Sequence, residues 1–211
     1  MILLKVIINN LKNSTKFEEI DEIKDYIYNL IPTVEIMFDF DQQNSAHQYD
    51  LWEHTVYTIL GLPRGLNDDM LYLAALSHDI GKPDCQCDGK IPEDKNKHYH
   101  GHQKKSMEIV RDEVIPFLKK KNIILSDEDI KRLLFYIEHH DDMLYNSIDC
   151  INKYSNMESF LAFKNLVLLE LADAKAHVMI PVVQKRVEVC EKLLKRFSEE
   201  ENINKMIKEE K

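Results

Sequence analysis

The stretch LAALSHDIGKP, residues 73–83, ends an apolar run with the adjacent pair His78 and Asp79. The spacing of its apolar residues predicts a helix, and His78 shares their inward-facing stripe. Gly81 and Pro83 predict the end of this helix, because glycine favours a helix C-terminus and proline cannot continue a helix. Successive helical residues point about 100° apart. His78 and Asp79 can therefore reach one point only where the chain turns away, as it does at a helix end.

The rest of the chain has the composition of an all-α protein. It contains only 5 Gly and 6 Pro among 211 residues, and 44% of its residues are hydrophobic, enough to bury a core. Helical patterns occur at residues 17–30, 50–61, 70–80, 102–110, 126–140, 157–180 and 182–197, with a long loop at 83–101 and an N-terminal segment that fits either strand or helix. We predict a helical bundle of residues 36–200, an N-terminal helical extension, 1–35, packed on it, and a charged tail, 201–211.

Two further residues can join the His-Asp pair from separate helices. His54 lies in a helix that Asp50 and Glu53 are expected to cap, and Asp173 stands alone among the apolar residues of LLELADA, 168–174. An unpaired buried charge is costly, and a metal ion removes that cost. Two imidazoles and two carboxylates suit a divalent metal and leave room for water or a substrate oxygen. Taken singly, each residue has a plainer interpretation, as a hydrogen-bonded core histidine or a buried salt bridge. Together they predict a metal site made of His54, His78, Asp79 and Asp173.

Three more residues are candidates for the same site. His102 opens a predicted helix and His140 closes another, so either side chain could hold a second ion or contact a phosphate. Only one of His139 and His140 is expected to face the site, because neighbouring helical residues diverge. Lys82 follows His78 by four residues, which could bring an ammonium group to a phosphate. The alternative interpretation of Lys82 is a solvated loop lysine.

The long predicted loop offers a different metal site. Its thiols and imidazoles, with the histidine that follows the loop, are Cys85, Cys87, His98, His100 and His102. Structural zinc sites usually have two to four residues between paired cysteines, and here only one residue separates them. We therefore expect these thiols to lie outside the metal site, and we expect all the cysteines to be free.

The charge of the chain limits its partners. Lys and Arg number 28 against 37 Asp and Glu, a net charge of −9. Nucleic-acid phosphates need basic surfaces, so general nucleic-acid binding is not expected, whereas a small nucleotide could be held through a metal. The first ten residues lack the features of a secretory signal. No apolar run reaches the roughly 18 residues of a membrane span. We expect a cytoplasmic protein without membrane association.

Together these motifs resemble the HD-domain phosphohydrolases. The ordered signature of that family, His … His-Asp … Asp, is matched by His54, His78, Asp79 and Asp173. Closer still, the chain is similar to the HD domain of bacterial tRNA nucleotidyltransferases, the CCA-adding enzymes, over roughly residues 36–176. The matching text is FDFDQQNSAHQYDLWEHT, LAALSHDIGKPDC, HYHGHQKKS, EHHD and LLELADAKA. The sequence has no counterpart of the nucleotidyltransferase head, so CCA addition is not expected of this chain alone.

The resemblance implies a single-domain HD-type helical bundle and divalent-metal-dependent hydrolysis of phosphomonoesters or phosphodiesters, 2′,3′-cyclic phosphates included. It marks His102 and His140 as extra ligand positions. The expected cofactor is one ion or two of Mn, Fe, Ni, Co, Zn or Mg, and the expected substrate is a small phosphorylated molecule or a nucleotide. Asp79, Lys82 and His102 are the expected catalytic residues. The alternatives are a non-catalytic metal or nucleotide sensor and an accessory subunit of a separate tRNA nucleotidyltransferase. Binding of tRNA rests on the resemblance alone, and the oligomeric state is left open.

Overall fold

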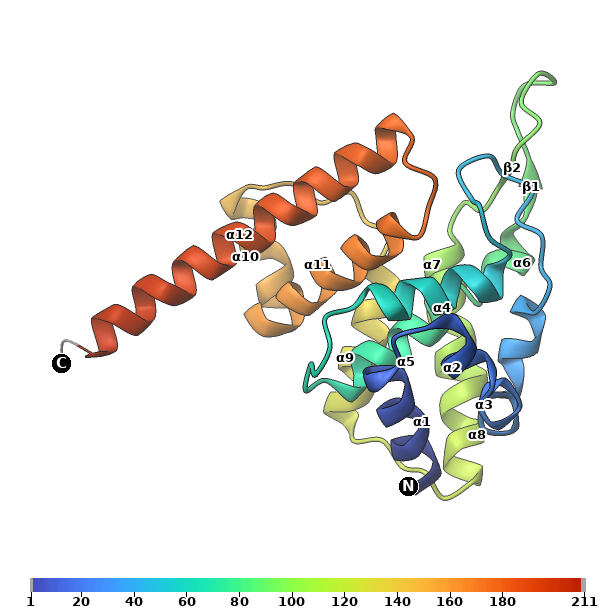
Figure 1. The fold of residues 1–211 in the computed structure, drawn as a ribbon, viewed down its shortest axis with the longest axis horizontal. Coiled ribbons are helices and arrows are strands. Elements are labelled where there is room, and N and C mark those ends of the chain that lie inside the picture. The colour runs from blue at the N-terminus through green and yellow to red at the C-terminus, as the bar shows by residue number, and fades with distance from the viewer. Residues whose placement is uncertain (1, 210–211) are drawn as a thin grey trace.

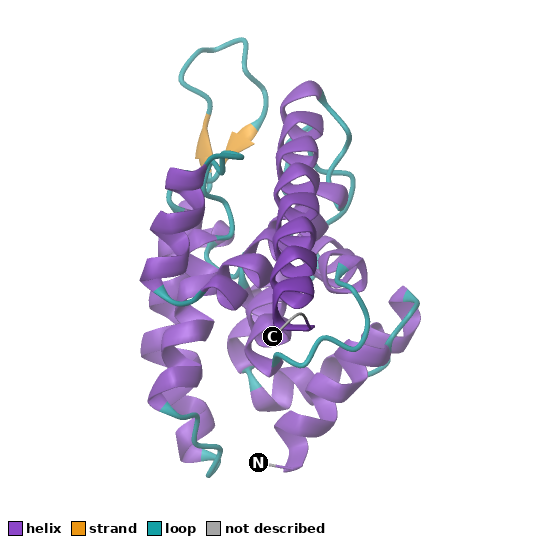
Figure 2. Ribbon diagram, turned by 90° about the vertical axis from the view of Figure 1, so that its left-hand side faces the viewer, coloured by secondary structure: helices purple, strands orange, loops and turns teal. Residues whose placement is uncertain are grey.

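Helices make up almost all of the regular structure, as the composition predicted (Figures 1 and 2). The computed structural model describes the backbone of residues 2–209 and the side chains of residues 3–199. Within that range the elements are, in order, α1 (Ile2–Asn13), α2 (Phe17–Asp21), α3 (Lys24–Leu30), the 3₁₀ helix η1 (Pro32–Met37), α4 (Leu51–Gly61), α5 (Asp69–Ser77), α6 (Lys82–Cys85), β1 (Cys87–Asp88), β2 (Lys97–His98), α7 (His102–Ile109), the π-helical turn η2 (Val110–Val114), α8 (Ile115–Lys120), α9 (Asp127–His139), α10 (Ile148–Met157), α11 (Phe160–Lys175) and α12 (Pro181–Glu209).

Helix α11 lies at the centre of the bundle and packs against α4, α5, α9, α10 and α12. Apolar residues occupy every side of it, which is typical of a helix surrounded by others. Leu166, Val167, Leu169 and Ala172 are all buried. This position brings the C-terminal half of α11, which carries Asp173, next to α4 and α5.

Side-chain caps fix where α4 and α5 begin. Asp50 and Glu53 form the predicted capping box of α4. At the start of α5, one oxygen of Asp68 accepts hydrogen bonds from two backbone N–H groups of the first turn. Its other oxygen accepts from Tyr136 Oη of α9 at 2.7 Å and from Asn165 Nδ2 of α11 at 2.9 Å. One carboxylate therefore ties three helices together at the end of α5 that lies away from His78.

The structure corrects several predicted boundaries. The helix expected at 17–30 is two helices, α2 and α3, with a short break between them. The helix expected at 157–180 is shorter, because the Ser159 hydroxyl caps α11 at its start, and the unpredicted helix α10 precedes it. The undecided N-terminal segment is helix α1. Helix α12 continues to Glu209, beyond the end predicted near residue 197.

The segment predicted as a long loop contains regular structure. After Gly81 a short helix, α6, starts at Lys82, with Pro83 in its first turn, where the missing N–H costs little. Two short antiparallel strands follow, with Cys87 opposite His98. The hairpin projects from the helical body in Figure 2, and its β2 end leads directly into α7.

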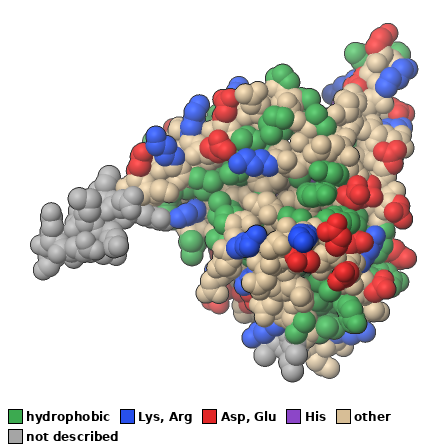
Figure 3. All heavy atoms as spheres, viewed as in Figure 1, with side chains coloured by type: hydrophobic (Ala, Val, Ile, Leu, Met, Phe, Trp, Pro, Cys, Tyr) green, Lys and Arg blue, Asp and Glu red, His purple; other side chains and the backbone are tan. Residues whose placement is uncertain are grey.

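The surface carries charges of both signs. On the face drawn in Figure 3, basic and acidic side chains are interspersed with hydrophobic ones rather than gathered into one basic area. Within the part of the chain that the structure describes, none of the helices combines the length and the apolar character needed to cross a membrane.

Candidate metal centre

Four buried side chains from three helical segments meet at one point. His54 comes from α4, Asp173 from α11, and His78 and Asp79 from the end of α5. His54 Nε2 lies 2.9 Å from Asp173 Oδ1 and 3.4 Å from Asp79 Oδ2. His78 Nε2 lies 3.2 Å from the same Asp79 oxygen and 3.7 Å from the same Asp173 oxygen. The structure thus brings together the four residues that the sequence predicted, which we call the first ligand group.

A second group forms on the other oxygen of Asp79. His102, the first residue of α7, places Nε2 3.1 Å from Asp79 Oδ1. His140, which follows α9, places Nε2 3.4 Å from the same oxygen, and the two imidazole nitrogens lie 3.3 Å apart. His139 points elsewhere, because its Nδ1 pairs with Asp142 Oδ2 at 2.8 Å. Asp79 therefore faces both groups, with one carboxylate oxygen toward each. We call Asp79, His102 and His140 the second ligand group.

Backbone carbonyls hold three of these histidines in one tautomer. Nδ1 of each ring lies 2.7–2.8 Å from the backbone oxygen three residues earlier, in His78, His102 and His140. A carbonyl oxygen only accepts a hydrogen bond, so Nδ1 carries a proton, and in the neutral form of each ring Nε2 presents its lone pair to the site. With both rings neutral, His102 Nε2, His140 Nε2 and Asp79 Oδ1 are three acceptors facing one another. Acceptor atoms this close repel one another electrostatically, and a cation bound between them removes the repulsion.

The distances and the unpaired atoms both fit a metal ion. Two ligands bound at about 2.1 Å and at right angles lie about 3 Å apart, which is close to most separations within each group. His78 Nε2 and both carboxylate oxygens of Asp79 are buried and make no hydrogen bond with the described residues. Buried polar atoms are normally hydrogen-bonded. Imidazole and carboxylate donors suit divalent metals such as Mn, Fe, Ni, Co and Zn, so both groups could hold an ion.

Comparison with known families agrees with this geometry. The family model described as HD domain matches residues 51–175. The chain belongs to the HD domain family. No curated protein matches the chain. The matched range of the HD domain contains every residue of both ligand groups.

Electrostatics within the HD domain favour a bound cation. Burial alone would raise the pKa of Asp79, but His78 and Lys82 hold it well below its usual value. Burial likewise opposes ionisation of Asp173, whose pKa is lowered by Arg186 and His177. Burial would lower the pKa of His78, yet the two carboxylates raise it to about 10. Without metal, the buried negative charge of Asp79 and Asp173 is therefore balanced by protonated His78 and by neighbouring basic side chains.

Lys82 is buried within the HD domain rather than solvated. Its Nζ lies 2.7 Å from Asp79 Oδ2, an ion pair whose angles are not those of a hydrogen bond, and it donates a hydrogen bond to Gln42 Oε1 at 2.9 Å. Gln42 is itself buried and donates to the backbone oxygen of Tyr49. An ammonium group has three donors, so Lys82 can still offer one to a ligand.

Arg186 of α12 reaches the site from outside the range that the family model matches. Its Nη1 lies 3.0 Å from Asp173 Oδ2 and 3.2 Å from Asp141 Oδ1. Because Arg186 occupies Oδ2, Asp173 presents its other oxygen to the first ligand group. Its Nη2 also donates to the backbone oxygen of His140. Sequence reasoning missed Arg186, since one arginine in a charged amphipathic helix carries no sign of what it contacts.

The two ligand groups open onto a cavity of about 330 Å³. The second group, Lys82 and Arg186 contribute to its wall. So do His47 and His177, which sequence reasoning also missed. His47 lies in a polar loop, and His177 follows the end of α11. Neither segment has a periodic pattern from which the direction of a side chain could be predicted.

The zinc site considered in the loop is not assembled. Among the described residues, no cysteine belongs to a group of side chains that could hold a metal, whereas His102 belongs to the second ligand group. His98 pairs with Asp94 Oδ2 at 2.7 Å. All the cysteines are free, as expected.

Proposed function

We propose that this HD domain is a divalent-metal-dependent phosphohydrolase acting on small phosphomonoesters or phosphodiesters. The observation that carries the proposal is Asp79, whose two carboxylate oxygens face two separate groups of metal-compatible side chains. A bound divalent ion supplies a water of lowered pKa and polarises a phosphoryl oxygen. Two ions held by one shared carboxylate would suit both the attacking and the leaving oxygen of a displacement at phosphorus.

The residues of the site would have distinct roles in metal binding and in catalysis. His54, His78 and Asp173 would hold the first ion, and His102 and His140 the second, with Asp79 between them. Lys82 lines the cavity and keeps a free donor, so it would offset negative charge on the phosphoryl group in the transition state. Arg186 would fix the orientation of Asp173 rather than touch the reacting atoms.

The size of the cavity supports a small substrate. A volume of about 330 Å³ lies at the lower end of the range for small-molecule sites, roughly 300–1,000 Å³. This favours a mononucleotide or a smaller phosphate ester. The resemblance to the HD domain of CCA-adding enzymes adds 2′,3′-cyclic phosphates to the candidates.

The test is turnover by the purified chain freed of metal and reloaded separately with Mn²⁺, Co²⁺, Ni²⁺, Zn²⁺ or Mg²⁺. Substrates are p-nitrophenyl phosphate, bis-p-nitrophenyl phosphate and adenosine 2′,3′-cyclic phosphate. The measured products are p-nitrophenol from the first two and adenosine monophosphate from the third. Asp79→Asn should abolish turnover, because it weakens both groups without changing side-chain volume. Asp84→Asn, which changes an exposed carboxylate paired with Lys105, should leave turnover unchanged. Tight metal binding with no turnover of any substrate would instead support the non-catalytic sensor.

A further inference from the structure

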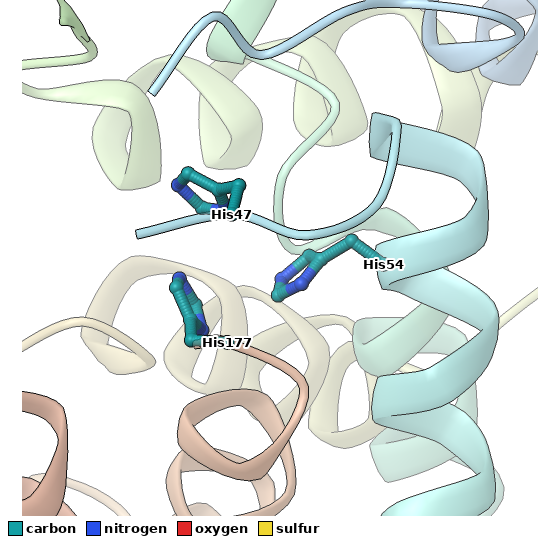
Figure 4. Close-up of side chains that lie close together, drawn as sticks. All are labelled: His47, His54 and His177. Atoms are coloured by element: carbon teal, nitrogen blue, oxygen red, sulfur yellow. The ribbon is translucent and has the colours of Figure 1, made fainter. Parts of the chain in front are cut away.

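A third group of imidazoles shares His54 with the first ligand group (Figure 4). It consists of His47, His54 and His177, and Figure 4 shows the three rings turned toward a common space. The ring centroids of His47 and His177 lie 4.4 Å apart, those of His54 and His177 4.7 Å, and those of His47 and His54 5.6 Å. One nitrogen of each ring lies within 4.8 Å of one nitrogen of the others. His47 and His177 lie outside the range that the HD family model matches.

Backbone hydrogen bonds hold the two segments that bring His47 and His177 together. Val178 N, one residue after His177, donates to Ala46 O, one residue before His47, at 2.9 Å. The loop of His47 is also anchored to the hairpin, because Lys97 N donates to a backbone oxygen of that loop at 2.8 Å. His47 and His177 therefore keep their mutual position without relying on contacts between their own rings.

Two of the three rings in this group have a buried nitrogen without a hydrogen-bond partner among the described residues. His47 Nδ1 and His54 Nδ1 are both buried and make no hydrogen bond with the described residues. His177 Nδ1 donates to the backbone oxygen of Asp173 at 2.8 Å, so its Nε2 presents a lone pair. Two buried nitrogens without a hydrogen-bond partner are unusual, and a ligand bound between the rings would satisfy them together with the lone pair of His177 Nε2.

We propose that His47, His54 and His177 form a separate transition-metal position. Two imidazoles bound to one ion at about 2.1 Å and near the tetrahedral angle place their ring centroids about 5 Å apart, which matches the three observed separations. All three donors are imidazoles. Imidazole suits Zn, Cu, Ni and Fe, whereas Mg prefers oxygen donors. The position should therefore take Zn²⁺ and reject Mg²⁺.

His54 would connect this position to the first ligand group. When His54 Nε2 binds an ion of the first group, Nδ1 carries the ring proton. Binding of a second ion at Nδ1 would require that proton to leave to solvent, and His54 would then offer one ring nitrogen to each position. The position thus uses the ring edge that the proposed phosphohydrolase site leaves free.

The test is the number of ions bound per chain. Metal-free full-length protein is dialysed to equilibrium against Zn²⁺, and bound zinc is counted by inductively coupled plasma mass spectrometry. His47→Gln and His177→Gln should each hold one zinc ion fewer than the wild type. His100→Gln, which removes an exposed imidazole from the same cavity, should hold the wild-type number. With Mg²⁺ in place of Zn²⁺, all four proteins should bind equally.

Equal zinc content in the wild type, His47→Gln and His177→Gln would overturn the proposal. The two substitutions lie in different segments, and circular dichroism of the metal-free proteins checks that each variant folds. Zinc binding by Asp79→Asn distinguishes a failure of this proposal from a failure of the proposed phosphohydrolase site. If Asp79→Asn retains all of the wild-type zinc, the first and second ligand groups are wrong, whereas loss of one ion in the His47 and His177 variants still supports the third position.

Discussion

The ammonium of Lys82 lies 2.7 Å from the carboxylate of Asp79, on the same oxygen that faces His54 and His78. Both groups are buried, so the ion pair is poorly screened by solvent. In the absence of metal, Lys82 supplies part of the positive charge that this carboxylate requires. A bound ion and Lys82 therefore compete for one oxygen of Asp79. Lys82 should stabilise the metal-free fold and at the same time lower the affinity for the metal.

Lys82→Met keeps the length of the side chain and removes its charge. We expect the metal-free variant to lose stability, because removing one partner of a buried ion pair costs about 3–5 kcal/mol. We also expect it to bind Mn²⁺ more tightly than the wild type, since a competing cation is gone, and to turn over substrate more slowly. Urea unfolding in chelator and calorimetric titration with Mn²⁺ measure the two effects. Unchanged or weaker Mn²⁺ binding would show that Lys82 does not compete for Asp79.

Arg186→Met should weaken metal binding although Arg186 is not a proposed ligand. Arg186 holds one oxygen of Asp173 at 3.0 Å and so directs the other oxygen at the first ligand group. Loss of such a supporting contact typically lowers metal affinity by about 10–100-fold. Competition with a fluorescent chelator measures the affinity. Arg111→Met is the matched control, because Arg111 pairs with Asp112 on the surface, and its metal affinity should equal that of the wild type.

The stability of the metal-free protein should depend on the ionisation of His78. The pKa of His78 is raised to about 10 by the neighbouring carboxylates, above the value of about 6.5 in an unfolded chain. The folded state therefore binds the proton more tightly, so this stabilisation is complete below pH 6.5 and is lost as the pH rises toward 10. In chelator, the free energy of unfolding should fall between pH 6.5 and 9.5.

His78→Asn isolates the contribution of this one group. Other residues titrate over the same pH interval, but they are common to both proteins. The difference in the free energy of unfolding between wild type and variant should therefore shrink as the pH rises. A difference that stays constant from pH 6.5 to 9.5 would show that His78 is not protonated in the metal-free fold.

Asp68→Ala should destabilise the fold without changing the metal site directly. It removes the cap of α5, worth about 1 kcal/mol, and leaves the buried Tyr136 hydroxyl and Asn165 amide without their partner. We expect a total loss of at least about 2 kcal/mol, because hydrogen bonds to charged groups contribute about 1.5–3 kcal/mol each. Urea unfolding measures it. Ser147→Ala, which removes the cap of α10 alone, should cost only about 1 kcal/mol.

The sequence alone determined the helical class and the starts of three helices around the site, α4, α5 and α9. Asp50 with Glu53, Asp68 and Ser126 each cap the helix that the sequence predicted, because capping depends on neighbours within one turn. The candidate ligands His54, His78, Asp79 and Asp173 were also found from sequence, since a polar side chain on an apolar helix face must meet another polar group. The sequence patterns gave the wrong element bounds at 17–30, 83–101 and 157–180, where the elements depend on tertiary packing.

Only the tertiary structure decided which atoms face one another. It assigned the two oxygens of Asp79 to two different ligand groups and turned His140 inward in place of His139. It also brought Arg186 to Asp173 and His177 to His47, pairs whose members come from separate segments of the chain. Such contacts are absent from any local pattern, because they arise when helices distant in sequence pack around α11 to bury its apolar surface.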